Sequence, residues 1–203
     1  MQFAFINGSH RNPSQSGKVT DFLQQTAEAE GVCQRSWRFD LADNPLPLWD
    51  QGIWDGDPAW HERLAPVREG LQASDALVVV TPEWHGMAPA GLKNFFLMLN
   101  AGLVGHKPAL LVGVSNGPGG AYPIAELRMS SYKNNRICYI PEQLIIRDVE
   151  KVLNPQGDND PEADPYYRAR SLYALRILGA YAQALGAVRA SGLTFDERFK
   201  NGM

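Results

Sequence analysis

The chain has 203 residues, 44% of them hydrophobic and 20% charged, and its formal net charge at pH 7 is −3. This is the composition of a globular protein, and it excludes long disordered stretches. The acidic balance argues against nucleic acid as a partner, because a nucleic-acid binder needs a basic face. The two cysteines are too few for a disulfide framework. No apolar run reaches the ~20 residues that cross a bilayer. We therefore expect one cytoplasmic domain over residues 1–203, without a membrane partner.

The chain opens with a short apolar run, residues 3–6, that breaks into a polar loop at residues 7–18. Apolar residues then recur at helical spacing from Val19 to Leu23. This pattern is typical of a buried strand that turns into a helix through glycine, hydroxyls and a cation. The helix start offers unpaired N–H groups and a partial positive charge, and the polar side chains complete a shell around a dianion. The loop predicts a site for the phosphate of a nucleotide or a flavin.

Four side chains of this first loop are candidate phosphate ligands: Ser9, Arg11, Ser14 and Ser16. A simpler interpretation is that Ser14 or Ser16 only caps the helix. A cap needs one hydroxyl, whereas the loop offers three hydroxyls and a guanidinium together, so we favour the anion site. Lys18 either adds charge to that site or lies on the solvated face of the helix, and we favour the second position.

The rest of the chain alternates apolar runs with helical patterns. Residues 76–80 and 109–114 lack polar alternation, as do strands that are covered on both faces. Gly31 is placed to end the first helix. Five strands separated by helices predict an α/β protein with a doubly wound parallel sheet in three layers. The predicted strands lie near 2–7, 32–39, 75–81, 108–115 and 142–147, and the predicted helices near 16–30, 58–73, 89–101, 119–133 and 165–190.

Two longer excursions interrupt this alternation. The segment 48–54 is rich in tryptophan, so it either packs onto its own domain or forms part of a dimer surface. The segment 154–165 is rich in Asp, Asn, Gly and Pro, which is typical of a solvated loop. The last helical pattern, 165–190, is expected to cover the sheet.

A second polar loop follows the third predicted strand. Prolines stiffen it, and its glycine allows a ligand to approach the backbone closely. A flat aromatic ligand could stack on this loop, although a proline-rich turn with a packed tryptophan fits equally well. The carboxylate here is more simply a partner of loop amides or Lys93 than a general acid, and the imidazole more simply a hydrogen-bonded group than a base. The residues are Pro82, Glu83, Trp84, His85 and Gly86.

A third loop, rich in glycine, follows the fourth predicted strand, and its backbone N–H groups could face a ligand. Alone it is as well explained by a tight connection. Since ligands of open parallel sheets sit beyond the carboxyl ends of the strands, three such loops together predict one ligand site. The residues are Ser115, Asn116, Gly117, Gly119 and Gly120.

With these loops, the chain resembles the NADPH-dependent FMN reductase family, flavodoxin-like proteins that include quinone, chromate and azo-dye reductases. The matching segments lie in register from residue 2 to about residue 147. The resemblance implies a flavodoxin-like three-layer α/β/α sandwich with a five-stranded parallel sheet. It also implies that the first loop binds the FMN phosphate, that the second lies along the isoalloxazine, and that the third approaches the ring and ribityl chain.

Three departures from the family pattern stand out. The family usually has Tyr-Asn where this chain has Trp84 and His85, so the surroundings of the ring differ. The family's phosphate loop often ends in Asn where Ser16 stands here, and a hydroxyl also donates to phosphate. The last third of the chain matches only in general layout.

The resemblance implies an oxidoreductase that takes hydride from NADPH or NADH through bound FMN. The electrons pass to a small acceptor: a quinone, an azo compound, chromate or free flavin. The flavin carries the chemistry, so no catalytic side chain and no metal are expected. Asp40 is not taken as an NAD ribose ligand, because the first loop lacks Gly-x-Gly-x-x-Gly spacing. A homodimer or homotetramer is expected. The alternatives are a flavodoxin-type FMN electron carrier that docks redox proteins, and a flavin-free binding module.

Overall fold

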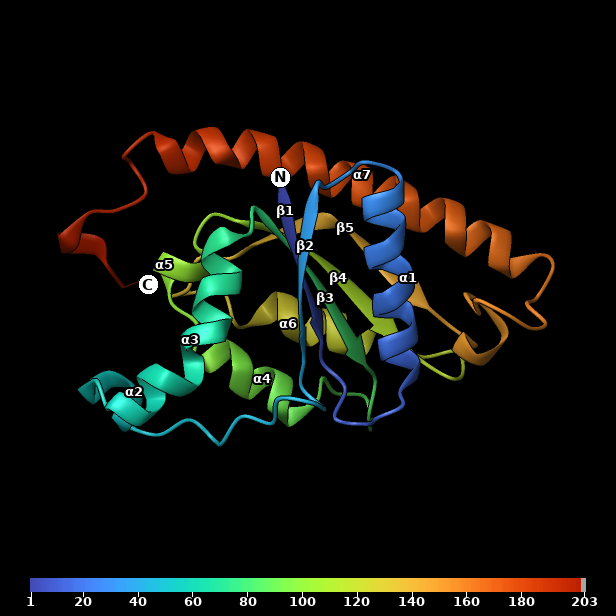
Figure 1. The fold of residues 1–203 in the computed structure, drawn as a ribbon, viewed down its shortest axis with the longest axis horizontal. Helices are drawn as coiled ribbons and strands as arrows, with labels where there is room; N and C mark the ends of the chain where they lie inside the picture. Colours follow the sequence, from blue (N-terminus) through green and yellow to red (C-terminus); the bar gives the residue numbers. More distant parts are fainter. Residues whose placement is uncertain (202–203) are drawn as a thin grey trace.

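The computed structural model describes residues 1–201, and its core is a single sheet of five strands in the order β2-β1-β3-β4-β5 (Figure 1). All neighbouring strands are parallel. The chain builds outward from β1 on both sides, so the direction of winding switches between β1 and β3. The five-stranded flavodoxin-like α/β sheet is therefore confirmed. The strands are β1 (Gln2–Asn7), β2 (Arg35–Asp40), β3 (Ala76–Pro82), β4 (Pro108–Val114) and β5 (Cys138–Ile146).

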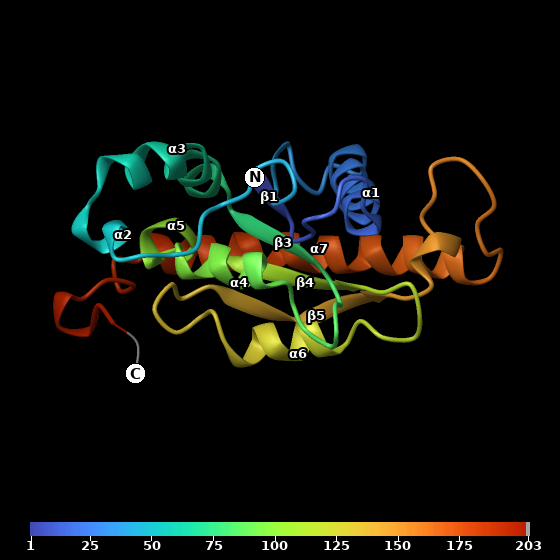
Figure 2. The ribbon, with the colours of Figure 1, turned by 90° about the horizontal axis from the view of Figure 1, so that it is seen from below.

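Helices cover both faces of this sheet (Figure 2). The first and last long helices pack on one face, and the helices from the middle of the chain pack on the other. The α-helices are α1 (Gln15–Ala29), α2 (Gly52–Asp55), α3 (Pro58–Ala73), α4 (Ala90–Leu97), α5 (Ala101–Val104), α6 (Tyr122–Met129) and α7 (Ala163–Ala190). Two short 3-10 turns are η1 (Val149–Lys151) and η2 (Glu197–Phe199).

The alternation of side chains along each strand divides the core in two. Phe5 and Val78 face the layer of α1 and α7, while Ile6 and Val79 face α3, α4 and α6. Every residue of β3 and of β4 is buried, as their unbroken apolar runs predicted. Gly31 follows the last turn of α1 with φ of 64°, which is the left-handed position that favours glycine.

Four predicted elements differ from the structure at their ends. The predicted strand 32–39 begins later, at Arg35, because the N–H groups of Val32 and Cys33 donate to Ala27 O at the end of α1. The predicted helix 89–101 is broken, because Asn100 has an extended backbone and starts a separate short helix, α5. The predicted helix 119–133 shrinks to α6, because Gly120 has φ of 99° and Ser130 is extended. The predicted strand 142–147 begins earlier, at Cys138, and includes Pro141, which an edge strand tolerates.

Candidate functional site

The three predicted loops meet at the carboxyl ends of β1, β3 and β4, where the loops after β1 and β3 lie side by side (Figure 1). They enclose a cavity of about 210 Å³. Its wall combines hydroxyls, one guanidinium, one carboxylate, two amides and an indole. The lining residues are Ser9, Arg11, Ser14, Gln15, Ser16, Pro82, Glu83, Trp84, Val114, Ser115 and Asn116.

The first loop is held in shape by its own hydroxyls. The Oγ of Ser9, which is 1% exposed, accepts the N–H of Arg11 at 3.1 Å. Ser14 is the N-cap of α1, and its Oγ accepts the N–H of Gly17 at 2.9 Å. The simpler interpretation of Ser14 as a cap is therefore correct as far as it goes. Its hydroxyl hydrogen remains available to donate to a ligand, because the oxygen is the acceptor in this bond.

Positively charged and hydrogen-bond-donating groups at the mouth of this loop have no partner among the described residues. The Arg11 guanidinium is exposed, and no hydrogen bond or ion pair within residues 1–201 ties it to another side chain. The N–H groups of Gln15 and Ser16, in the first turn of α1, have no acceptor inside the helix. Together with the partial positive charge of the helix start, these groups suit a dianion.

A chain of hydrogen bonds from β2 fixes the start of the loop. Arg38 donates to both oxygens of Asp40, and Asp40 accepts the amide of Asn7 at 2.6 Å. The Oδ1 of Asn7 in turn accepts the N–H of Ser9 at 3.2 Å. Burial raises the pKa of Asp40, but hydrogen bonds from Arg38 and Asn7 outweigh it and leave that pKa below its ordinary value. Asp40 is thus a support of the first loop.

The second loop is a tight two-residue turn. Trp84 and Met87 exchange backbone hydrogen bonds of 3.1 and 3.0 Å, and His85 and Gly86 between them both have positive φ, 51° and 72°. Two positive φ angles define a type I′ turn, which explains the glycine. His85 and Gly86 are exposed at its tip and do not line the cavity. Trp84 does, and its ring centroid lies 6.4 Å from that of His10.

Glu83 connects the second loop to the third. Its N–H donates to Val114 O at 3.0 Å, and its Oε2 accepts the N–H of Gly120 at 2.6 Å. Gly120 adopts φ of 99°, and a Cβ on it would come within 2.8 Å of Ile145. The carboxylate thus holds a loop amide, one of the two simpler expectations, whereas Lys93 pairs with Glu126 at 2.8 Å.

The third loop is anchored to the end of β5. Ser115 donates its N–H to Ile146 O at 3.0 Å, and its Oγ accepts the N–H of Gly117 at 3.2 Å. The amide of Asn116 donates to Glu150 in η1 at 3.0 Å. Ser115 and Asn116 line the cavity, while Gly117, Gly119 and Gly120 are not among its lining residues.

Gln15 and Val114 also line the cavity and are absent from the predicted set. The Oε1 of Gln15 is buried and has no hydrogen-bond partner among the described residues. Such an oxygen costs free energy unless a ligand donates to it. A hydroxyl of a ribityl chain is a donor of this kind, and the unpaired Arg11 and helix start suit a phosphate. The residues present therefore fit FMN. The signal for Gln15 was its place between Ser14 and Ser16 in the first helical turn.

Lys18 lies neither at the cavity nor on a solvated face, so that expectation is wrong. Its ammonium donates to Val149 O, Val152 O and Asn154 Oδ1 at 2.5, 2.9 and 2.7 Å. Burial lowers the pKa of Lys18, against opposing attraction from nearby carboxylates. The side chain ties α1 to the turn after β5.

Residues 1–201 hold neither a membrane-spanning helix nor a metal cluster. No helix in this part of the chain is long and apolar enough to cross a membrane. No three His, Cys, Asp or Glu residues gather there in a way that could hold a metal ion.

Comparison with known proteins agrees with this geometry. The family model for NADPH-dependent FMN reductases matches residues 1–151. An FMN-dependent NADPH-azoreductase of Staphylococcus aureus is 30% identical over 166 residues, which cover 80% of this chain and 87% of that protein.

Solved structures show the same fold at lower identity. The flavoenzyme NAD(P)H:(acceptor) oxidoreductase of Paracoccus denitrificans has a TM-score of 0.69 at 22% identity, over 90% of this chain and 97% of that one. An oxidoreductase of Corynebacterium diphtheriae has a TM-score of 0.68 at 18% identity, with the same coverage.

The family match confirms the resemblance inferred from the three loops, and with it the expected class, an NAD(P)H-dependent oxidoreductase that uses FMN. It favours a reductase over an electron carrier. The chain belongs to the NADPH-dependent FMN reductase family.

Proposed function

We propose that the three loops bind FMN and that residues 1–203 act as one FMN-binding domain. The first loop would hold the phosphate through Ser9, Arg11, Ser14 and Ser16. The second and third loops would flank the ring and the ribityl chain, through Pro82, Glu83, Trp84, His85 and Gly86 and through Ser115, Asn116, Gly117, Gly119 and Gly120. The observation that carries this proposal is the cavity joining all three loops, with an unpaired guanidinium at its mouth.

Bound FMN supplies hydride acceptance and electron release, so the protein's task is to bind, orient and shield. The Arg11 guanidinium would hold the phosphate through charge-assisted hydrogen bonds. The buried Ser9 and the buried Oε1 of Gln15 would face the bound FMN within the cavity. Glu83 keeps the second and third loops at a fixed separation through Gly120. No side chain is required to move a proton, and the carboxylate of Glu83 is already engaged.

The substrates follow from the same class. NADPH or NADH would visit the exposed face of the flavin and leave before the acceptor enters, which gives ping-pong kinetics. The azoreductase relative supports an azo compound or a quinone as the acceptor. We place the enzyme in the cytoplasm. We also expect a homodimer or homotetramer, because two apolar side chains of the tryptophan-rich segment, Leu48 and Trp54, are 78% and 73% exposed.

The decisive experiment is a visible spectrum of the purified protein, recorded before and after anaerobic addition of NADPH. We expect a flavin spectrum that NADPH bleaches and that a quinone restores. A flavodoxin-type carrier would keep its flavin colour and would consume no NADPH without a separate reductase.

The phosphate site is tested by Arg11→Ala. Loss of a charge-assisted bond should weaken FMN binding roughly ten- to a hundredfold. Arg35→Ala, which removes another exposed guanidinium on β2, is the matched control and should bind FMN normally. If Arg11→Ala keeps its flavin through dialysis as the wild type does, the phosphate lies elsewhere.

A further inference from the structure

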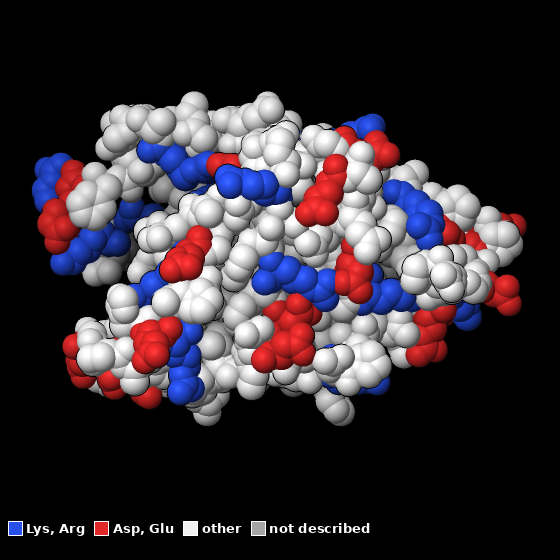
Figure 3. Space-filling model, in the orientation of Figure 1, with Lys and Arg blue, Asp and Glu red and all other residues white. Residues whose placement is uncertain are grey.

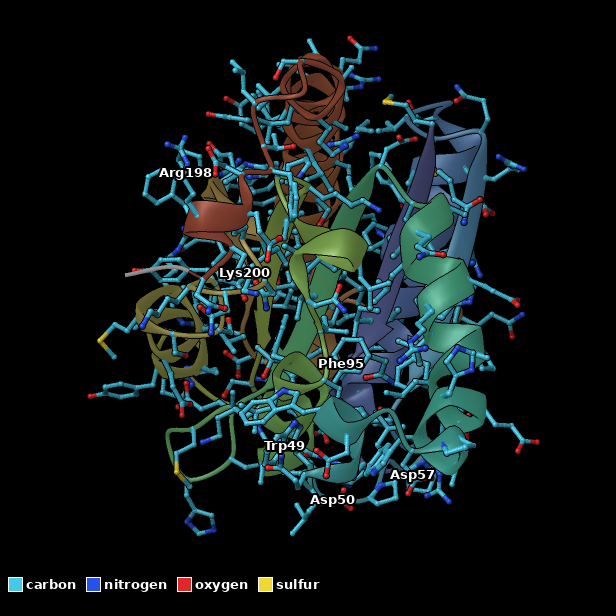
Figure 4. All side chains as sticks on the ribbon, turned by 90° about the vertical axis from the view of Figure 1, so that its left-hand side faces the viewer. Trp49, Asp50, Asp57, Phe95, Arg198 and Lys200 are labelled. Atoms are coloured by element: carbon cyan, nitrogen blue, oxygen red, sulfur yellow. The ribbon has the colours of Figure 1, made fainter. Side chains whose placement is uncertain are left out.

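A second and larger cavity, of about 1050 Å³, lies at the amino ends of β4 and β5. It opens between the helices α4, α5 and α6 and the C-terminal segment that follows α7. Figure 3 shows the hollow between that segment and the body of the molecule, with basic side chains on its wall. Figure 4 faces this side and shows Lys200 on the C-terminal segment.

The charged side chains that line this cavity are all positive. Six Lys and Arg residues line it, and no Asp or Glu is among its lining residues. This is a strong local bias in a chain whose formal net charge is −3. The six cations are Lys93, Lys107, Lys133, Arg136, Arg189 and Lys200.

Two of these cations, Lys107 and Arg136, donate only to carbonyl oxygens among the described residues. Three of the others have carboxylates beside them: Lys93 pairs with Glu126, Arg189 with Asp75 and Lys200 with Glu197. Lys107 is 7% exposed, and its ammonium donates to the carbonyls of Leu71 and Gln72 at 2.6 and 3.3 Å. Burial, reinforced by the Arg189 charge, lowers the pKa of Lys107 to about 8. Arg136 donates to two carbonyls of the C-terminal segment. Asp75 lies 3.6 Å from Arg189 and also attracts Lys107, so among the described residues one carboxylate offsets only part of the charge of Lys107, Arg136 and Arg189.

His106 also lines this cavity, and one of its ring nitrogens lacks a hydrogen-bond partner within residues 1–201. Its backbone has φ of 56°, and its Nε2 is buried without a hydrogen-bond partner among the described residues. Burial lowers the pKa of His106, as do the charges of Arg136 and Arg189. Its neutral imidazole offers one N–H donor or one acceptor to an occupant.

Apolar side chains also line this cavity. Phe96 and Leu127 are buried there, while Leu97 and Trp54 are 67% and 73% exposed, and Phe195 comes from the C-terminal segment. A cavity lined by both apolar and cationic side chains suits a molecule with an apolar body and an anionic head. The volume is that of sites for small organic ligands.

The two cavities are too far apart to be one site. The FMN cavity includes Val114, at the carboxyl end of β4, while the second cavity includes Lys107, just before its amino end. β4 has 7 residues, which at ~3.3 Å per residue separates its ends by roughly 20 Å. An occupant of the second cavity would thus leave the flavin site free.

We propose that this cavity is a second ligand site, which binds an organic anion with a carboxylate or sulfonate head on an aromatic body. The head lies against Lys107, Arg136 and Arg189, and the body lies against Phe96, Leu97 and Phe195. Lys133 and Lys200 attract the anion at the entrance.

The test is calorimetric titration of the FMN-saturated protein with 2-naphthalenesulfonate. The neutral 2-naphthalenesulfonamide, of the same size and shape, is the matched ligand. We expect one sulfonate per chain, at least tenfold tighter than the sulfonamide, with the flavin spectrum still showing full occupancy. Absence of binding, equal affinity for the two ligands, or displacement of FMN would each overturn the proposal.

Charge reversal then locates the site. Lys133 is exposed and makes no hydrogen bond or ion pair within residues 1–201, so Lys133→Glu should leave the fold intact. Lys133→Glu and Lys200→Glu should each weaken sulfonate binding severalfold, and the double variant more than tenfold. Arg35→Glu is the control, since Arg35 is exposed on β2 and outside the cavity. If Arg35→Glu weakens sulfonate binding as much as Lys133→Glu does, the anion responds to the net charge of the protein and not to this cavity, which contradicts the proposal.

Discussion

At the scale of single residues, Glu83 determines how far apart the second and third loops lie. Its carboxylate accepts the N–H of Gly120 at 2.6 Å. Glu83→Ala removes the acceptor and leaves that amide unpaired, which costs roughly 1–3 kcal/mol. We expect weaker FMN binding in this variant, measured by titration of the apoprotein with FMN, and a lower free energy of unfolding.

Glu83→Gln separates this positioning role from acid chemistry. The amide oxygen of Gln can still accept the Gly120 N–H, so the variant should bind FMN nearly as well as the wild type and keep its pH profile with NADPH. A general acid at this position would instead show as a loss of kcat with unchanged FMN affinity.

Lys107 makes stability depend on alkaline pH. The pKa of Lys107 is about 8 in the folded protein, and it is 10.5 in the unfolded chain. Below pH 8 the ammonium is charged in both states, and its burial costs the folded state in full. Between pH 8 and 10.5 the unfolded chain holds the proton and the folded chain does not, so stability rises with pH.

Lys107→Met isolates this contribution. The difference in unfolding free energy between wild type and variant should move in favour of the wild type by up to roughly 3 kcal/mol across that window. Urea unfolding at a series of pH values measures it. A difference that stays constant with pH would show that Lys107 keeps its ordinary pKa.

At the scale of elements, the strands and their loops were predictable because the signals are local. β3 and β4 are continuous apolar runs, and each ends directly in the polar loop that lines the cavity. The support of the first loop was not predictable. Arg38, Asp40 and Asn7 come together only because β1 and β2 are neighbours, with Asn7 directly opposite Asp40. Which strands become neighbours cannot be predicted from the sequence of either strand alone.

The position of Lys18 on α1 also depends on contacts that are distant in the sequence. Its sequence position favoured solvent, yet the turn after β5 folds back over α1 and supplies three oxygens. Lys18→Met leaves those oxygens without their donor, so we expect a loss of roughly 1–3 kcal/mol in unfolding free energy. Urea unfolding measures it, with Lys151→Met as control because Lys151 is exposed and makes one surface ion pair. Equal unfolding free energies of the two variants would show that the Lys18 hydrogen bonds to the turn after β5 do not stabilise the fold.

At the scale of the whole molecule, the tryptophan-rich segment both packs on its own chain and presents an apolar surface. Trp49 donates its backbone N–H to Asn94 in α4 at 2.8 Å, and Trp49 and Ile53 both pack against the cluster that includes Trp60. This side of the molecule carries Trp49, Asp50 and Phe95 in Figure 4. The backbone of the segment is therefore fixed, while Leu48 stays 78% exposed. A fixed apolar surface is suited to pairing with a second copy.

Leu48→Asp tests that pairing. A carboxylate in the centre of an apolar interface loses its water without gaining a partner, so the variant should dissociate to monomers in analytical ultracentrifugation. Met129→Asp is the matched control, because Met129 is also 78% exposed but lies on α6, outside the tryptophan-rich segment. We expect that control to keep the mass of the wild type. A Leu48→Asp variant that remains a dimer would move the interface to another face, and a wild type that is already monomeric would remove the interface altogether.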